Sequence, residues 1–130
     1  MKTFLARLLL ALALIAAPVV FTGCAGGPER TALNVVKMQI TTVDTAMQAF
    51  TEYERIHGMD APTRLRVKAL YAEHVRHNLA VERAWLAYRT ALESAAPDAP
   101  ALEKHLNAAR AILLTSQTDL IALIQSILNH

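Results

Sequence analysis

Two copies of one triplet, Asp60-Ala61-Pro62 and Asp98-Ala99-Pro100, divide the chain after residue 28 into three segments of similar length. An Asp can accept hydrogen bonds from the free amides at a helix N-terminus, and a Pro fits the first turn, where no amide donor is needed. Gly58 can end a preceding helix in the left-handed conformation. The sequence therefore predicts three helices, at about 29–57, 61–94 and 99–129.

Apolar residues recur at spacings of three and four in each segment, which is the pattern of a helix with one buried face. In the first segment these residues are Leu33, Val36, Ile40, Val43, Met47 and Phe50. In the second they are Val67, Tyr71, Val81, Trp85, Tyr88 and Leu92. In the third they are Leu102, Leu106, Ala109, Leu113, Leu120, Leu123 and Ile127. Strand signals are absent, and loops of a few residues force neighbouring helices to be antiparallel. We predict an all-α fold, an up-down-up three-helix bundle over residues 29–130.

Polar residues interrupt these apolar faces at one height of the predicted bundle. His74 and Asn78 stand near the centre of the face of the second helix, and Ser116 interrupts the third. Antiparallel pairing puts Thr45 and Asp119 level with His74, and Thr41 and Thr115 level with Asn78. We expect His74 to be buried, within reach of Asp119, Thr115 or Ser116. A hydrogen-bonded layer that fixes the register is the interpretation we favour, and a polar pocket or a pH-sensitive joint is the alternative.

A second apolar stripe lies away from the core faces. It repeats every seven residues and consists of Leu65, Ala72, Leu79 and Leu86 on the second helix, with Leu114, Ile121 and Leu128 on the third. A bundle of this size has no evident need to bury both stripes. The stripe either widens the seam between the two helices or forms a face for another helix, from a partner or from a second copy.

Motifs of catalysis are missing from the sequence. It has no Gly-rich phosphate loop, no nucleophile elbow and no CxxC pair. His74 and His77 lie three residues apart beside Glu73, but a single pair on one helix is weak evidence for a metal. We predict no enzymatic activity, no cofactor and no metal.

The N-terminus has the pattern of an export signal. Lys2 and Arg7 precede an apolar run of 13 residues, from Leu8 to Val20, and Gly23 is followed by Cys24, the only cysteine of the chain. The run is too short for a membrane-spanning helix, which needs roughly 20 apolar residues. With one cysteine no disulfide can form within the chain.

Phe21-Thr22-Gly23-Cys24 resembles the lipobox of bacterial lipoproteins, with Phe21 where Leu is usual. The resemblance implies that residues 1–23 are a cleaved signal peptide and that Cys24 is acylated. It also implies outer-membrane placement, because the next residue is Ala25 and not the Asp that retains such proteins at the inner membrane. Residues 24–28 would then be a short tether. The alternative is cleavage after Ala25 by an ordinary signal peptidase, which would leave a soluble periplasmic protein.

Loss of Lys2 and Arg7 with the signal changes the charge balance. The whole chain has 13 Lys and Arg against 11 Asp and Glu, so residues 24–130 have 11 against 11. This balance gives no argument for nucleic-acid binding. The second helix is nevertheless locally basic, which favours a solvated face or, alternatively, contact with anionic lipid head groups.

The chain after Cys24 is loosely similar to small alanine-rich helical lipoproteins of bacterial and prophage genomes, a likeness of length, lipobox and helices only. We therefore expect a lipid-anchored, non-enzymatic envelope protein that binds a protein partner or a second copy, such as a pilotin-like escort or an assembly factor. The alternative is a periplasmic small-ligand or metal-binding module that uses the layer around His74.

Overall fold

The computed structural model describes the backbone of residues 28–130, with the side chains of Lys37 and of residues 40–130. Three helices account for most of this part of the chain: α2 (Pro28–His57), α3 (Ala61–Glu93) and α4 (Ala99–Leu128). No strand occurs within residues 28–130. The three predicted helices and the all-α fold are confirmed, with ends within about one residue of the prediction. The predicted signal peptide, and the predicted tether from Cys24 except for Pro28, lie outside the described residues.

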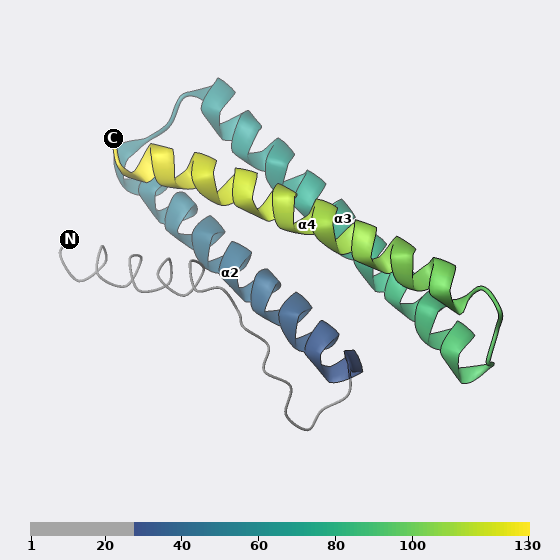
Figure 1. Ribbon diagram of the computed structural model, residues 1–130. Helices are drawn as coiled ribbons and strands as arrows, with labels where there is room; N and C mark the ends of the chain where they lie inside the picture. The colour runs from purple at the N-terminus through teal and green to yellow at the C-terminus, as the bar shows by residue number, and fades with distance from the viewer. Residues whose placement is uncertain (1–27) are drawn as a thin grey trace. The chain divides into compact units, whose positions relative to one another are not determined.

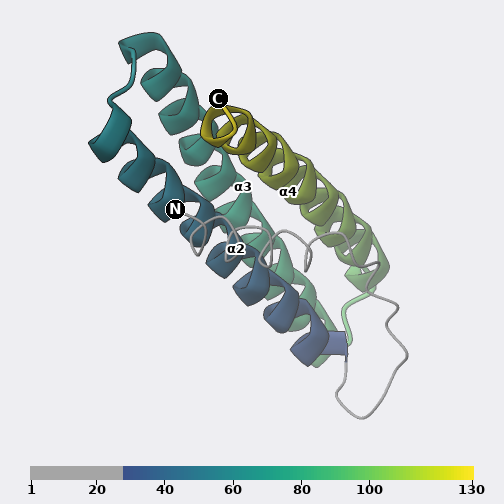
Figure 2. The same cartoon turned by 90° about the vertical axis from the view of Figure 1, so that its left-hand side faces the viewer.

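The chain divides into two compact units, residues 1–42 and Val43–His130. The second unit contains the last half of α2 together with α3 and α4. Helices α3 and α4 lie side by side along their length, and the C-terminus lies at the end where α2 is joined to α3 (Figures 1 and 2). The up-down-up order is therefore present within this unit.

Large apolar side chains from all three helices form the core of this unit. Phe50 of α2, Val67 of α3 and Ile124 of α4 belong to one buried cluster, together with Val43 and Leu120. Val43, His74 and Gln117 lie one heptad from Phe50, Val67 and Ile124 respectively, and all three are buried. Because neighbouring helices are antiparallel, this step runs backward along α2 and α4 and forward along α3. The apolar layer is thus followed by a layer with two polar side chains.

The turn between α2 and α3 has the predicted chemistry. Gly58 has a φ of 71° and its amide donates to Glu54 O at 2.9 Å, so the glycine ends α2 in the left-handed region. Asp60 Oδ2 then accepts from Thr63 N at 2.9 Å, which caps α3. The Arg64 side chain forms an ion pair with Glu54 across this turn and so connects α3 to α2.

The turn between α3 and α4 differs from the prediction. Asp98 precedes α4 but makes no side-chain capping bond, because its backbone is already helical, with a φ of −89° and a ψ of 0°. A capping residue usually has extended backbone, which aims its side chain at the free amides. The end of α3 is closed instead by Ala95, whose φ is 51°, and by a bond from Ala96 N to Ala91 O at 2.8 Å.

The buried faces agree with the predicted apolar faces in part. Val43, Phe50, Val67, Val81, Leu106, Leu113 and Leu120 are buried as predicted. Leu92 is exposed, and the last part of α3 buries the small side chains of Ala84 and Ala91 in its place. On α4 the prediction missed the column formed by Gln117 and Ile124, which is buried next to the expected one.

Helix α4 is long and apolar enough to cross a membrane on length and composition alone. Part of this apolar surface is buried inside the unit, at Leu106, Leu113, Leu120 and Ile124. A core helix of a helical bundle has the same composition, so this property does not identify a membrane span.

Candidate functional site: a buried polar layer and the groove beside it

His74 is the centre of the buried polar layer. His74 is buried, as predicted, with 3 % of its surface exposed, and Gln117 of α4 is 6 % exposed. Asn78 follows one turn along α3 and is half-buried. His74 Nδ1, Asn78 Oδ1 and Gln117 Oε1 are buried and make no hydrogen bond within the described part of the chain. Three polar atoms at neighbouring heights therefore lack partners, which is uncommon in a folded interior.

Burial holds the pKa of His74 below its usual value of 6.5, and this desolvation is the largest effect. The nearby His77 lowers the pKa further, because two positive charges would repel. Asp44 of α2 acts in the opposite direction, since its carboxylate favours the protonated ring. The layer thus keeps His74 neutral although one acid lies within electrostatic range.

The other residues predicted for this layer lie elsewhere. Thr45, Thr115 and Asp119 are exposed, and Ser116 is half-buried. The Thr115 hydroxyl donates to Ala111 O at 3.2 Å, and the exposed Thr41 hydroxyl donates to Lys37 O at 3.0 Å. The buried polar residue of α4 is Gln117, two residues before the predicted Asp119. On α2 it is Asp44, and not the predicted Thr45, that acts on the pKa of His74.

Thr115, Ser116 and Asp119 come together in a groove on the surface between α3 and α4. The α3 wall consists of Leu70, Glu73 and His77, and the α4 wall consists of Ala111, Ile112, Thr115, Ser116 and Asp119. His77, and not His74, is the histidine that shares this groove with the three α4 residues. The two histidines are about one helical turn apart, and yet His74 is buried whereas His77 lies at the surface.

The groove combines acidic and apolar side chains. His77 Nε2 lies 3.5 Å from Glu73 Oε1, and Asp119 is the acid of the opposite wall. Ile112 is exposed and gives the same groove apolar surface. The groove has a volume of about 310 Å³, at the lower end of the range for small-molecule sites, and it is partly open to solvent. These properties suit an extended or helical segment with a basic side chain.

Metal binding has no support from the described residues. No group of three or more His, Cys, Asp or Glu side chains within residues 28–130 has the arrangement of a metal site. Glu73 and His77 are neighbours, but they do not form such a group with Asp119.

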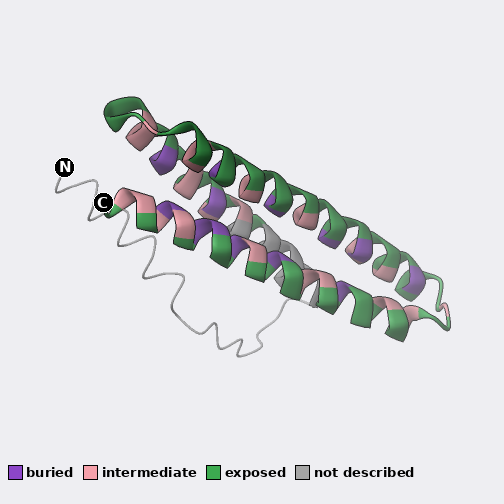
Figure 3. Ribbon diagram, turned by 90° about the horizontal axis from the view of Figure 1, so that it is seen from above, coloured by how far each residue is buried: buried purple, intermediate pink, exposed green. Residues whose placement is uncertain are grey.

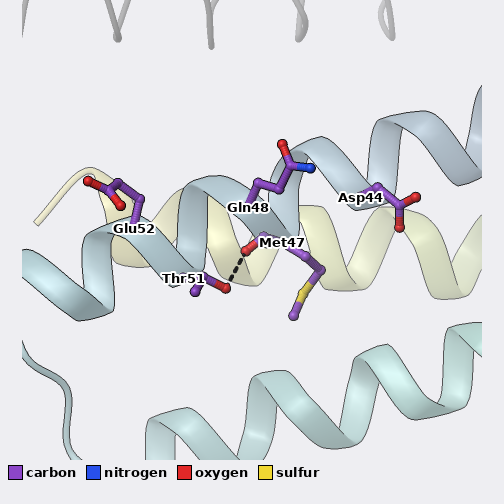
Figure 4. Close-up of a pocket in the computed structure, with 5 residues that line it drawn as sticks. All are labelled: Asp44, Met47, Gln48, Thr51 and Glu52. Atoms are coloured by element: carbon purple, nitrogen blue, oxygen red, sulfur yellow. Dashed lines mark hydrogen bonds between the residues drawn. The ribbon is translucent and has the colours of Figure 1, made fainter.

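A further hollow lies beside α2, where its described lining is Asp44, Met47, Gln48, Thr51 and Glu52. In Figure 4 Met47 extends toward α3, whereas Gln48 points to the other side of α2. The Thr51 hydroxyl donates to Met47 O at 2.8 Å, so it is used within the helix. Hydrogen bonds from Arg55 keep the pKa of Glu52 below its usual value. All the described lining comes from one helix, which makes this hollow a weaker candidate than the groove.

The predicted outer stripe is split by the structure. Leu65, Leu79, Leu86 and Leu114 are exposed. Ile121 is only 8 % exposed, and Leu128 packs against the core cluster. For Ile121 and Leu128 the structure therefore bears out the first alternative, a wider seam between the helices, and these two residues do not belong to an exposed partner face.

Gln117 and Asp44 are the residues that the sequence interpretation missed. Gln117 lies seven residues before Ile124 and four after Leu113, so a second heptad column through these positions indicates its burial. Asp44 directly follows the core residue Val43 and is itself exposed, so no spacing rule marks it as a neighbour of His74. Comparison with protein-family models, with curated proteins and with solved structures found no match for this chain.

Proposed function

We propose that this protein is a lipoprotein of the bacterial cell envelope, held in the outer membrane by acylated Cys24 and facing the periplasm. The order of a basic start, an apolar run and Gly23-Cys24 supports the anchor. The use of the only cysteine at this position supports it too, since no internal disulfide competes for the thiol. Several acyl chains on one residue hold a protein far more firmly than a single chain does.

The function we propose for the helical part is non-enzymatic binding of another protein. The observation that carries this proposal is the groove between α3 and α4, whose lining includes the exposed Ile112 and the acids Glu73 and Asp119. A partner helix that brings a Lys or Arg beside an apolar residue would match this surface in charge and in apolar contact. We assign no catalytic residues to the groove.

Affinity purification of the membrane-anchored protein tests the binding function. Glu73→Lys together with Asp119→Lys reverses the charge of both groove walls, whereas Glu103→Lys changes an exposed acid of α4 outside the groove. We expect a co-purifying chain to be lost from the double variant and retained by the control. Retention of every co-purifying chain by the double variant would contradict binding in the groove.

One observation favours a second function, the binding of a small polar ligand. His74, Asn78 and Gln117 have buried atoms without hydrogen-bond partners in the described part of the chain, and a bound molecule could pair with them. Native mass spectrometry of the purified protein separates the two functions. A retained small molecule that is lost in His74→Leu would support the ligand function, and an unliganded mass in both proteins would count against it.

A further inference from the structure

The outer side of α3 exposes a run of apolar side chains. Leu65, Leu79 and Leu86 are 66 %, 47 % and 54 % exposed, and they recur at multiples of seven residues with Ala72 between the first two. At about 100° per residue they lie opposite the buried His74 and its neighbours. Figure 3 shows exposed residues along one side of α3 and buried residues along the other. This face therefore takes no part in the core.

Basic side chains share the same side of the helix. Lys68, Arg76 and Arg83 are exposed and fall with the leucines, Ala72 and Val75 in an arc of about 100°. Between residues 65 and 86 this arc contains no acid, and Glu82 lies just outside it. No ion pair among the described residues involves Lys68, Arg76 or Arg83. The face is thus apolar and cationic, although residues 24–130 carry equal numbers of acidic and basic side chains.

A second copy of the chain does not match this face in charge. Pairing two α3 helices through it would bring the rows of Lys68, Arg76 and Arg83 together without an acid within the arc. Like charges at close range oppose such pairing, particularly once apolar contacts exclude water from between them.

An anionic lipid surface matches both properties. Leucine side chains can enter the boundary between head groups and acyl chains, while long basic side chains reach lipid phosphates at the level of the head groups. Cationic residues next to an anionic leaflet are attracted to it over about a Debye length. We propose that the outer face of α3 lies on an anionic lipid surface. This inference goes beyond the proposed function, because it needs neither acylation of Cys24 nor a protein partner.

A fluorophore that reports local polarity tests the contact in the full chain. Cys24→Ser removes the native thiol, and Ala72→Cys places one label at the centre of the face. Ala122→Cys is the matched control, because Ala122 is also an exposed alanine but lies on another helix, α4. Both proteins are reconstituted into vesicles of phosphatidylcholine alone or of phosphatidylcholine with phosphatidylglycerol. The N-terminal apolar segment is the same in all samples, so its contribution cancels.

In vesicles with phosphatidylglycerol we expect a blue shift at position 72 and quenching by a quencher carried on the lipid. We expect neither effect at position 122 nor in neutral vesicles. Replacing Lys68, Arg76 and Arg83 by Gln should abolish the shift at position 72 while the helical circular dichroism signal is unchanged. No shift at position 72, equal shifts at both positions, or a shift unaffected by the Gln replacements would overturn the proposal. A shift without vesicles that grows with protein concentration would show that a second copy covers the face, and would also overturn it.

Discussion

Replacing His74 by Leu should stabilise the folded protein. The His74 side chain is 3 % exposed and its Nδ1 atom is buried without a hydrogen-bond partner in the described part of the chain. A buried polar atom without a partner costs about 1–3 kcal/mol, and Leu has a similar size and no polar atom. We therefore expect His74→Leu to raise the free energy of unfolding by about 1–3 kcal/mol near neutral pH.

The stability of His74→Leu relative to the native protein should increase as the pH falls. Burial lowers the pKa of His74 in the folded state from the usual 6.5, so below that pH the unfolded chain takes up a proton that the folded chain excludes. His74 therefore contributes no pH dependence above about pH 6.5, and it destabilises the folded state progressively as the pH falls below that value. The loss ends when the pH passes the folded-state pKa. The free energy of unfolding falls by at most about 1.4 kcal/mol per pH unit, because one proton is involved.

Urea unfolding followed by circular dichroism, at several pH values between about 7.5 and 5, measures both effects. The native protein should lose stability across this range more steeply than His74→Leu does. His105→Gln is the control, because His105 is exposed on α4. It should stay within about 0.5 kcal/mol of the native protein at neutral pH. A loss of more than about 1 kcal/mol in His74→Leu at neutral pH would refute this reasoning, and so would parallel pH profiles for the native protein and His74→Leu.

Two further pairs of substitutions test the packing and the caps. Ile121→Glu should unfold the protein because Ile121 is 8 % exposed, whereas Leu79→Glu should keep the native circular dichroism spectrum because Leu79 is 47 % exposed. Similar spectra for the two variants would contradict the assignment of Ile121 to the core. Asp60→Ala should lower the urea midpoint more than Asp98→Ala does, because only Asp60 caps a helix with its side chain. The pKa of Asp60 is lowered, mainly by the bond from Thr63 N, so this stabilisation is present at neutral pH and is lost as the pH falls through the folded-state pKa. Equal midpoints for the two variants would argue against the cap.

Helix positions could be predicted because strong local signals mark their ends. Gly58 has no Cβ, so it can adopt the left-handed conformation that ends α2, and Asp60 next to it has extended backbone that aims its carboxylate at Thr63 N. The second triplet shows the limit of such signals. Asp98 is followed by the same Ala-Pro pair as Asp60, but the turn closed by Ala95 leaves its backbone helical. Turn conformation, which depends on how the helices pack, decides whether a capping residue caps.

The site was harder to predict than the fold because it depends on register. His74 was identified correctly as a buried residue, since it interrupts an apolar face. Its neighbours across the interface change with a shift of one or two residues, and such a shift exchanges Gln117 for Asp119. Leu114 and Ile121 stand seven residues apart on one side of α4, and yet Leu114 is exposed and Ile121 is buried. A periodic pattern specifies which side of a helix is apolar, whereas the depth of each residue depends on the volumes of the side chains that meet it.

The lipid anchor at Cys24 is the central claim, and metabolic labelling with a fatty acid tests it most directly. The native chain and Cys24→Ser are expressed in a bacterial host with a labelled acyl chain, and the protein is isolated and separated from free lipid. We expect label on the native chain that survives denaturation, no label on Cys24→Ser, and a shift of that variant out of the lipoprotein fraction. Equal labelling of the two proteins, or no label on a native chain that reaches the envelope, would contradict it.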